Sequence, residues 1–446
     1  MASSRKLQSD SLITPLLESL RQNGVNSRHQ VTVALSGGVD SVVLLHLASR
    51  AAGLLGFRLS AIHVNHQLQI QADAWVCFCQ QLCDDLGVPL HVSTPKIVRS
   101  GGESLEAVAR SARYAAFAHH ATDFLLLAHH ADDQAETLLL QLLRGAGVAG
   151  LAAMPVRQTH GGQVWLRPLL TSTRQDIENY ARKNKLTWVE DPSNRNCNFD
   201  RNFLRQSIMP LLLERFPAAR QTIGRSARHM AEAQVLLQSY AYESGCMRDE
   251  FLALDCWAAL PLEQQRNVLR CWLLRHELQL PAERRLLEMV RQLQNSRPDA
   301  QLRIAVTASC ELRRYRDRAW LVPHRELPPP GWQMTWSGEA ALDLTDLGGR
   351  LHFAAAEGQG IRRQLLDTGA VTVRLRAGGE RMRLYAGRPG KSLQHWFQEA
   401  GVPPWLRDTA PLVYVGEQLV WVAGLGAAVE AQALPGEVGV SIDFTP

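Results

Sequence analysis

Residues 31–47, with the sequence VTVALSGGVDSVVLLHL, constrain the fold more than any other stretch of this chain. The apolar, β-branched run VTVAL predicts a buried strand, and the run SVVLLHL predicts an apolar helix. Between them, Gly37 and Gly38 let the backbone turn sharply and leave no side chain in the way of a ligand. A strand that turns directly into a helix presents free amide groups and the positive end of the helix dipole. The stretch therefore predicts a phosphate site, built from Ser36, Gly37, Gly38, Val39, Asp40 and Ser41.

This loop differs from the two commonest phosphate-binding loops. It lacks the G-K-[S/T] ending of a Walker loop, and it does not contain G-x-G-x-x-G. The S-G-G-x-D-S pattern of residues 36–41 resembles instead the PP-loop ATP pyrophosphatases, which split ATP between its α- and β-phosphates and adenylate a substrate. The resemblance implies that Asp40 binds the Mg²⁺ that bridges the phosphates. The alternative is a strand–turn–helix corner whose small residues serve packing alone.

Length and composition bound the class of protein. A chain of 446 residues is too long for one hydrophobic core and predicts two or three domains. A net charge of +5 is too small to indicate a nucleic-acid partner by itself. No apolar run reaches the length of a membrane span, and the first ten residues lack the apolar core of a signal peptide. We therefore expect a cytoplasmic protein that does not contact the membrane.

Cysteine usage gives no sign of a metal or disulfide scaffold. The eight cysteines are scattered and none forms C-x-x-C, so we expect neither a zinc site nor a disulfide framework. Cys79 and Cys83 lie four residues apart on a predicted helix, and we expect them to pack as small buried hydrophobic side chains.

Apolar strands and helices alternate through the first part of the chain. This alternation predicts an α/β domain with a doubly wound parallel sheet, whose last strand, at 166–170, runs to the sheet edge. Ligands of such sheets bind outside the carboxyl ends of the strands, so the loops 36–41, 65–67 and 129–133 should border one crevice. Besides the first strand, we expect strands at 59–64, 90–93 and 124–128, and helices at 11–21, 72–86, 103–121, 132–143 and 173–185.

The segment 129–144, HHADDQAETLLLQLLR, is unusually rich in acidic residues for the start of a helix. Helical spacing places His129, Asp133 and Glu136 on one face, with Asp132 beside them. Acidic residues in a first turn favour the helix dipole, which accounts for one or two of them. Carboxylates at this place are also suited to binding Mg²⁺ together with Asp40, or to holding a cationic amine.

Basic residues near this crevice come from two further segments. Arg110 and Arg113 lie one turn apart on a predicted helix, and they either point into the phosphate crevice or form an ordinary solvated face. Residues 188–212 predict a long polar loop followed by a helix from about residue 202. The residues of this segment with chemically capable side chains are Glu190, Asp191, Asp200, Arg201, Asn202 and Arg205.

After residue 217 the pattern changes to long amphipathic helices, predicted at 221–243, 262–278 and 282–293 and followed by a hairpin of strands 302–308 and 316–322 with Arg313 and Arg314 between them. The run HRELPPPG at 324–331 predicts a stiff linker. Beyond it we expect a small α+β domain with strands at 351–354, 371–376, 412–415 and 420–423. The expected domains are an ATP-binding domain at 1–217, a helical domain at 218–323 and a C-terminal domain at 332–446.

Arginines cluster in the C-terminal stretch. Arg381, Arg383 and Lys391, with Tyr385 and Trp396 nearby, predict a surface that contacts nucleic-acid phosphates. A plain basic face that keeps the protein soluble is the alternative.

Seven motifs between residues 28 and 216 resemble the tRNA(Ile)-lysidine synthetase family: S-G-G-V-D-S, E-A-V-A-R-S-A-R-Y, A-H-H-A-D-D-Q-A-E-T, R-G-A-G-V-A-G-L-A-A-M, R-P-L-L, W-V-E-D-P-S-N and D-R-N-F-L-R. Residues 371–426 resemble the C-terminal domain of the same family, which contacts the body of the tRNA. The resemblance implies an ATP-dependent ligase. ATP adenylates C2 of the wobble cytidine in the CAU anticodon of tRNA(Ile), and the ε-amine of L-lysine then displaces AMP to form lysidine. Codon and amino-acid identity change from Met to Ile.

The resemblance also implies roles for individual residues. Asp133 and Glu136 hold the lysine, and Asp40 binds Mg²⁺. The base that deprotonates lysine stays open, because carboxylates orient an ammonium but also favour its protonated form. The sequence leaves the oligomeric state open, with a homodimer as one alternative. Two sets complete the implied site: ATP contacts from residues 36–41, Arg110, Arg113 and Arg205, and a catalytic lining from His129 and Asp132.

Two other functions compete with this interpretation. A PP-loop tRNA thiolase needs a pair of cysteines that handle sulfur near the site, and the sequence shows none there. A catalytically silent tRNA-binding module is disfavoured because Asp40, Asp133 and Glu136 are all present.

Overall fold

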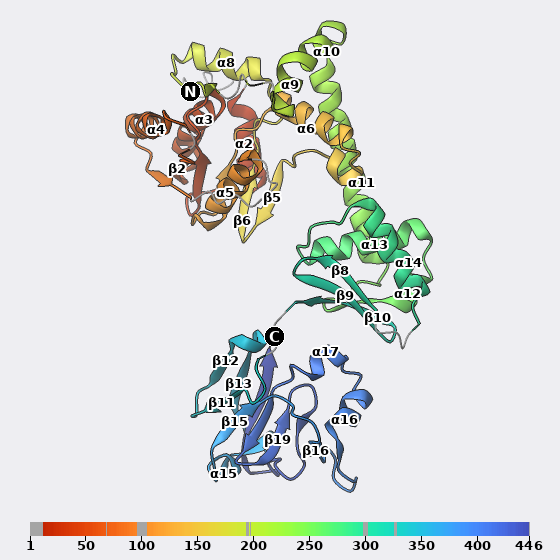
Figure 1. Cartoon of the computed structure of the whole chain (residues 1–446). Coiled ribbons are helices and arrows are strands. Elements are labelled where there is room, and N and C mark those ends of the chain that lie inside the picture. The colour runs from red at the N-terminus through yellow and green to blue at the C-terminus, as the bar shows by residue number, and fades with distance from the viewer. Residues whose placement is uncertain are drawn as a thin grey trace. The chain divides into compact units, whose positions relative to one another are not determined.

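The computed structural model describes residues 12–67, 69–95, 105–192, 196, 198–297, 302–324 and 328–445. Parts of several expected features, at residues 11, 103–104, 193–195, 197 and 325–327, lie outside this description. The chain divides into two compact units, Met1–Tyr240 and Ala241–Pro446 (Figure 1). In the described ranges, no helix has both the length and the apolar character needed to cross a bilayer.

A six-stranded sheet forms the centre of the first unit, in the order β3-β2-β1-β4-β6-β5. Five of its strands run parallel to their neighbours, which confirms the predicted parallel sheet. The strands are β1 (Gln30–Ala34), β2 (Arg58–Val64), β3 (Leu90–Ser93), β4 (Phe124–Leu126), β5 (Arg157–His160) and β6 (Gln163–Leu166).

The edge of this sheet differs from the expectation. The strand predicted at 166–170 ends at Leu166, because Pro168 follows and has no N–H to donate to a ladder. Instead, β5 pairs antiparallel with β6 across Gly161 and Gly162, which both have positive φ angles. Two glycines in left-handed conformations suit the tight turn of a hairpin.

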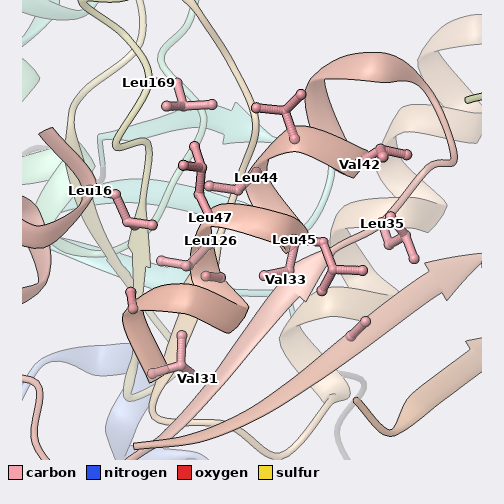
Figure 2. Packing of buried hydrophobic residues seen from close by; sticks show 14 of the residues in the cluster. Leu16, Val31, Val33, Leu35, Val42, Leu44, Leu45, Leu47, Leu126 and Leu169 are labelled. Atoms are coloured by element: carbon pink, nitrogen blue, oxygen red, sulfur yellow. The ribbon is translucent and has the colours of Figure 1, made fainter. Parts of the chain in front are cut away.

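Helices cover both faces of the sheet. On β4, Leu126 packs into the main core with β1 and helices α2 and α3 (Figure 2). Phe124 joins the same core, to which α8 also contributes, whereas Leu125 packs on the opposite face of the sheet against Phe117 of α5. The doubly wound arrangement is thereby confirmed. The helical segments of this unit are α2 (Ile13–Gln22), α3 (Val39–Leu55), α4 (Ala72–Leu86), α5 (Leu105–His119), α6 (Ala131–Leu143), α7 (Val148–Leu151), α8 (Arg174–Lys183), α9 (Asp200–Phe203), the π-helical turn η2 (Leu204–Ile208), α10 (Met209–Arg215) and α11 (Ala219–Glu243).

The strand order reverses its direction between β1 and β4. The chain runs from β1 outward through β2 and β3 and then returns to place β4 on the other side of β1. At such a switch point the loops after the two central strands diverge and leave a crevice at the carboxyl edge. The S-G-G-V-D-S loop follows β1 and the pair His129–His130 follows β4, so the fold brings the two most informative motifs together.

The middle part of the chain, in the second unit, is mixed rather than purely helical. Its four-stranded antiparallel sheet has the order β7-β10-β9-β8, so the two strands expected to pair with each other both flank β9 instead. Arg313 and Arg314 lie on β9 and not between strands. The charges of the run CELRRY concealed a strand whose Cys310 and Leu312 are buried. The elements are β7 (Phe251–Ala253), α12 (Leu254–Ala258), α13 (Leu262–Arg275), α14 (Glu283–Asn295), β8 (Arg303–Thr307), β9 (Cys310–Tyr315) and β10 (Arg318–Pro323).

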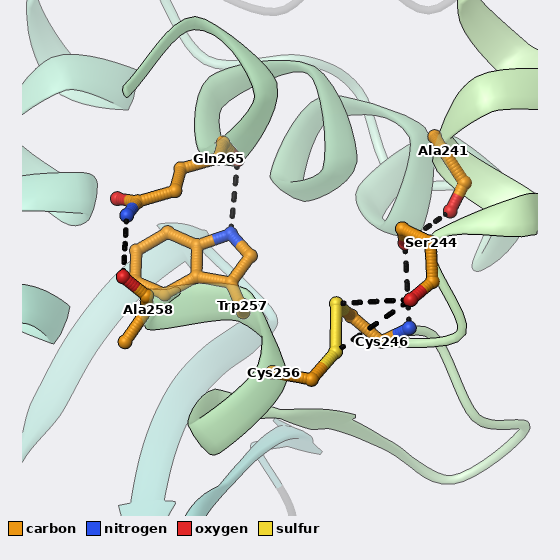
Figure 3. Close-up of a disulfide and its surroundings, with 7 residues drawn as sticks. All are labelled: Ala241, Ser244, Cys246, Cys256, Trp257, Ala258 and Gln265. Carbon is orange, nitrogen blue, oxygen red and sulfur yellow. Dashed lines mark hydrogen bonds between the residues drawn. A yellow bond between two sulfur atoms is a disulfide. The ribbon is translucent and has the colours of Figure 1, made fainter. Parts of the chain in front are cut away.

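A disulfide joins Cys246 and Cys256 beside the buried ring of Trp257 (Figure 3). The expectation of no disulfide was therefore wrong for this pair. Met247 and Leu252 form a β-bridge that folds the intervening chain back on itself and brings the Cα atoms of Cys246 and Cys256 to 5.7 Å. A spacing of ten residues in the sequence does not predict this proximity. Cys79 and Cys83 are buried in the main core, as predicted.

The C-terminal part is a small α+β structure, as expected. Two antiparallel sheets, β11-β15-β18-β19-β20 and β12-β13-β21-β14, share one apolar core, and β16 and β17 form a separate short ladder. Its elements are β11 (Gln333–Trp336), β12 (Ala341–Leu344), η3 (Thr345–Leu347), β13 (Gly349–Glu357), β14 (Ile361–Arg362), α15 (Arg363–Leu366), β15 (Val371–Arg374), β16 (Arg381–Met382), β17 (Lys391–Ser392), α16 (Leu393–Glu399), α17 (Pro404–Arg407), β18 (Leu412–Val415), β19 (Gln418–Val422), β20 (Gly426–Ala427) and β21 (Val438–Thr445).

The turn after β1 generates a stability prediction. Gly37 has a φ of +88°, and a Cβ atom there would lie 2.8 Å from Cγ2 of Val189, so Gly37→Ala should lower the free energy of unfolding by about 1–3 kcal/mol. Gly53, inside α3, has open space around it, and Gly53→Ala should raise stability by about 0.5–1 kcal/mol. Urea denaturation of both variants checks this, and shifts of the same sign would contradict it.

Candidate active site

The loop after β1 is held open toward solvent by its own hydrogen bonds. The amide of Ser36 donates to Oγ of Ser41 at 3.1 Å, and that hydroxyl donates to the carbonyl of Gly38 at 2.9 Å. No side chain caps the first turn of α3, whose N-cap is Gly38. The helix therefore presents backbone N–H groups and its positive dipole end to a ligand, which is the arrangement that binds phosphate.

Helix α6 begins on the other side of the crevice with a capping box. Its N-cap is His130, whose ring accepts from the amide of Asp133 while the Asp133 carboxylate accepts from the amide of His130. Because the helix starts at Ala131, His129 precedes it. The predicted common helical face therefore holds for Asp133 and Glu136 but was wrong for His129.

Asp133 and Glu136 form a buried acid pair that two arginines neutralise. Arg201 of α9 donates from Nε to Glu136 at 2.9 Å and from Nη2 to Asp133 at 3.1 Å. Arg205 of η2 donates from Nε to Glu136 at 2.7 Å and from Nη2 to Asp133 at 2.9 Å. Burial raises the pKa of Asp133, but the charges of His130, Arg201 and Arg205 outweigh it, so the pKa lies below its usual value.

Asp40 projects from the first turn of α3 toward α8 and α6. Its Oδ2 accepts from Nη1 of Arg174 at 2.7 Å, and its Oδ1 lies 3.6 Å from Nε2 of His130. Burial raises the pKa of Asp40 above its usual value, against the opposing charges of His130 and Arg174. Among the described residues, Oδ1 is buried and accepts no hydrogen bond.

Asp132 joins α6 to two other elements. Its carboxylate accepts from the amide of Arg174, at the start of α8, at 2.9 Å and from Nε of Arg220, at the start of α11. A capping box formed by Thr173 and Asp176 sets where α8 begins. Three helix starts, those of α6, α8 and α11, thus converge on one carboxylate.

These groups border a cleft of about 620 Å³ at the carboxyl edge of the sheet. Trp188 and Met209 supply apolar surface to it. Among the described residues, six carboxylates and three guanidinium groups line the cleft. The excess of negative charge favours binding of a cation in the cleft, beside the phosphate site at its edge. The predicted residues that line it are Ser36, Gly38, Val39, Asp40, Asp132, Glu136 and Arg205.

Other predicted residues stand back from this cleft. Asp133 is buried and does not line the cleft, and Gly37 and Ser41 are buried within the loop itself. Arg110 is exposed and lies over the ring of Tyr114, 5.0 Å from its centroid. Arg113 lies near His66, whose pKa is lowered mainly by burial and further by this arginine. Burial also lowers the pKa of His129 to about 3, so its imidazole is uncharged near neutral pH.

Sequence reasoning missed several residues of the cleft. Arg174 and Arg220 meet Asp40 and Asp132 from 134 and 88 residues away, and no local pattern marks them. His130 is also absent from the predicted site residues, although a histidine three residues before an aspartate is a weak capping-box signal.

Three family models match successive parts of this chain. A PP-loop domain matches residues 2–212, a TilS substrate binding domain matches residues 252–320, and a TilS substrate C-terminal domain matches residues 371–444. The tRNA(Ile)-lysidine synthase of Nitrosomonas europaea is 42% identical over 451 residues, which cover 100% of this chain and 98% of that protein. The tRNA(Ile)-lysidine synthase of Methylococcus capsulatus is 40% identical over 438 residues, which cover 96% of this chain and 99% of that protein.

This chain belongs to the tRNA(Ile)-lysidine synthase family. The predicted family resemblance is thereby confirmed over the whole chain and not only over its motifs. It is a PP-loop enzyme family, so ATP is the expected nucleotide of the loop after β1.

The family's C-terminal domain carries the three basic residues predicted to contact tRNA. Arg381 of β16 and Lys391 of β17 lie on two paired strands, and Arg381 donates to the carbonyl of Gly390 at 2.6 Å. Arg383 follows on the same segment and pairs with Glu430 at 2.7 Å. Lys391 pairs with Glu399 and lies 4.8 Å from the ring centroid of Trp396. All three side chains are at least partly exposed, so each remains accessible to a phosphate.

The acid pair generates a second stability prediction. Glu136 is 1% exposed, and Glu136→Gln would leave two partly buried guanidinium groups with one carboxylate between them, so we expect a loss of about 3 kcal/mol in the free energy of unfolding. Glu178 is more exposed and pairs with Arg174 and Arg182, so Glu178→Gln should cost less than about 1 kcal/mol. Urea denaturation distinguishes the two, and equal losses would contradict the assigned burial.

Proposed function

We propose that this chain is a tRNA(Ile)-lysidine synthase, which adenylates the wobble cytidine of tRNA(Ile) with ATP and couples L-lysine to C2 of that base. One observation carries the proposal. The PP-loop and an acidic helix start border a single cleft, in a chain whose family membership extends over its full length. Phosphate binding and amine binding are thus available within reach of one another, as a two-step ligation requires.

The chain's own groups suffice to bind and orient ATP. The N–H groups of the first turn of α3 receive a phosphate, and Arg205 is the nearby cation that contacts the nucleotide. Arg174 and Arg220 also line the cleft, paired with Asp40 and Asp132. Arg110 and Arg113 contact the nucleotide only from outside this cleft, so we assign them a weaker part.

The residues present fit a Mg²⁺ ion. Asp40 has a buried oxygen that accepts no hydrogen bond from any described residue, and carboxylate oxygen is the donor that Mg²⁺ prefers. No cluster of three or more candidate metal ligands occurs in the described residues, which suits an ion held by one carboxylate together with substrate phosphates. When bound, the ion would neutralise charge that develops on the phosphates. Asp40 is the residue that would hold it.

The second step joins lysine to the activated base. Glu136, which lines the cleft, and Asp133, which shares its two arginines, hold the ε-amine, and Asp132 and His129 shape the surrounding site. The nitrogen lone pair forms a bond to C2, the bond from C2 to the AMP oxygen breaks, AMP leaves with that electron pair, and one proton is released to water. The cleft brings the two reactants together, which replaces a collision in solution by a positioned attack.

Binding of the tRNA extends beyond the cleft. We propose a three-domain division at 1–217, 218–323 and 332–446, in which Arg381, Arg383 and Lys391 contact the body of a tRNA with the CAU anticodon.

We also propose that the enzyme works in the cytoplasm, because its substrates are found there. A disulfide such as Cys246–Cys256 is unusual in that compartment. A homodimer is compatible with this function, and light scattering of the purified protein decides it.

The direct test is transfer of labelled L-lysine to a tRNA(Ile) transcript in the presence of ATP and magnesium. We expect label in the RNA and one AMP released for each lysine transferred. Asp40→Ala should abolish AMP formation while thermal unfolding stays near that of the unchanged protein, because Arg174 retains Glu178 as a partner. As a control, Arg182→Ala, which removes the exposed arginine that also pairs with Glu178, should leave AMP formation intact. Unlabelled RNA with the unchanged protein would refute the proposed function.

The tRNA surface is tested by its salt dependence. Replacing Arg381 and Arg383 together with alanine should weaken tRNA binding and reduce the slope of log affinity against log salt by about two, since each lost phosphate contact lowers it by about one. Arg350→Ala, which removes an exposed arginine paired with Asp343 on another sheet of the same part, serves as the control. An unchanged slope in the double variant would assign these arginines to a plain surface.

A further inference from the structure

The acid pair of the lysine subsite is matched by an equal number of positive charges. Asp133 and Glu136 accept five hydrogen bonds from Arg201 and Arg205, at 2.7–3.1 Å. The four side chains together carry no net charge. Two carboxylates offer about eight acceptor sites, so the pair retains capacity for the N–H groups of a bound amine.

The proposed reaction sets a requirement that a bare acid pair would not meet. The ε-nitrogen of lysine attacks only as the neutral amine, and its ordinary pKa of about 10.4 keeps it protonated at neutral pH. Two unpaired carboxylates beside it would raise that pKa further. A subsite that binds lysine through negative charge alone would therefore hold its substrate in the unreactive form.

We propose that Arg201 cancels charge in the lysine subsite so that the enzyme holds its substrate as the neutral, attacking amine. This inference rests on the proposed function. Arg201 acts through Asp133 and Glu136, and it is therefore a positioning residue. We choose Arg201 rather than Arg205 because a change at Arg201 tests the charge of the lysine subsite apart from nucleotide binding. Arg205 lines the cleft and its positive form is further favoured by Asp40, whereas Arg201 is not part of the cleft lining.

Other titratable and charged groups also lie around the acid pair. His129 is uncharged near neutral pH, because burial lowers its pKa to about 3. The other groups that face the pair, or face His129 beside it, are Asp40 of α3, His130 at the start of α6, Arg110 of α5 and Arg167 after β6.

The test is the pH profile of the lysine step, measured as lysine-dependent AMP release from adenylated tRNA. Loss of one positive charge near the amine should raise the apparent pKa of this step by about one to two pH units in Arg201→Gln. The rate at pH 7 should fall about 10–100-fold and recover as the pH rises. Arg201→Lys keeps the charge and should restore most of the original profile. Arg182→Gln, an exposed arginine of α8, should change nothing.

Other outcomes overturn the inference. A slower Arg201→Gln enzyme with an unchanged profile would assign Arg201 a purely structural role. A lower KM for lysine without a change in profile would make Arg201 a competitor for the subsite. Should Arg201→Gln not fold, Arg201→Lys and the unchanged enzyme are compared with the γ-thia analogue of lysine, whose amine is more acidic. The analogue must lower the apparent pKa in both enzymes, and an unmoved profile would refute attack by the neutral amine.

Pyrophosphate release without lysine separates this inference from the proposed function. Arg201→Gln should still release pyrophosphate from ATP and tRNA without lysine, with the same pH dependence as the unchanged protein. If the unchanged protein releases none, the proposed function itself fails. If it releases pyrophosphate normally while the lysine step shows no displaced profile in Arg201→Gln, only the role of Arg201 fails.

Discussion

The cluster of two carboxylates and two guanidinium groups between α6, α9 and η2 is the interaction on which the site depends. The segment that supplies the arginines has little apolar anchorage, because α9 buries no side chain and η2 buries only Leu204. Charge pairing therefore holds this wall of the cleft where hydrophobic packing does not. Burying the two carboxylates costs several kcal/mol per ion, and only close, multiply bonded partners offset that cost. The positions of these four side chains are consequently more constrained than those of apolar side chains in a hydrophobic wall would be.

The rest of the site follows from where a parallel sheet ends its strands. β1 and β4 are neighbours, so the helices that follow them, α3 and α6, begin at the same edge. One helix start is left without a side-chain cap and is suited to a phosphate, whereas the other is closed by His130 and Asp133. This difference gives the two sides of the crevice opposite preferences, one for an anion and one for cations. A ligation between a nucleotide and an amine needs both preferences side by side.

Much of this arrangement could be predicted from local sequence. The glycine turn, the parallel sheet and the acidic helix start each depend on neighbouring residues, and each was found where expected. Interactions between distant segments could not be predicted, and Arg174 and Arg220 reach the cleft from elements with no sign of that role. The charged strand β9 and the Cys246–Cys256 pair were missed for a related reason, because partners across space decided their structure. The Gly161–Gly162 hairpin carried a local signal that a neighbouring apolar run obscured.

Helix α11 has a practical consequence for anyone who isolates the catalytic part of this protein. The compact first unit extends to Tyr240, within α11, and that helix begins with a segment whose Arg220 guanidinium reaches Asp132. A truncated protein that stops at residue 217, where the sequence pattern changes, would lack this arginine and open one wall of the cleft to solvent. Shortened versions made for crystallography or inhibitor screening should therefore retain the first turns of α11.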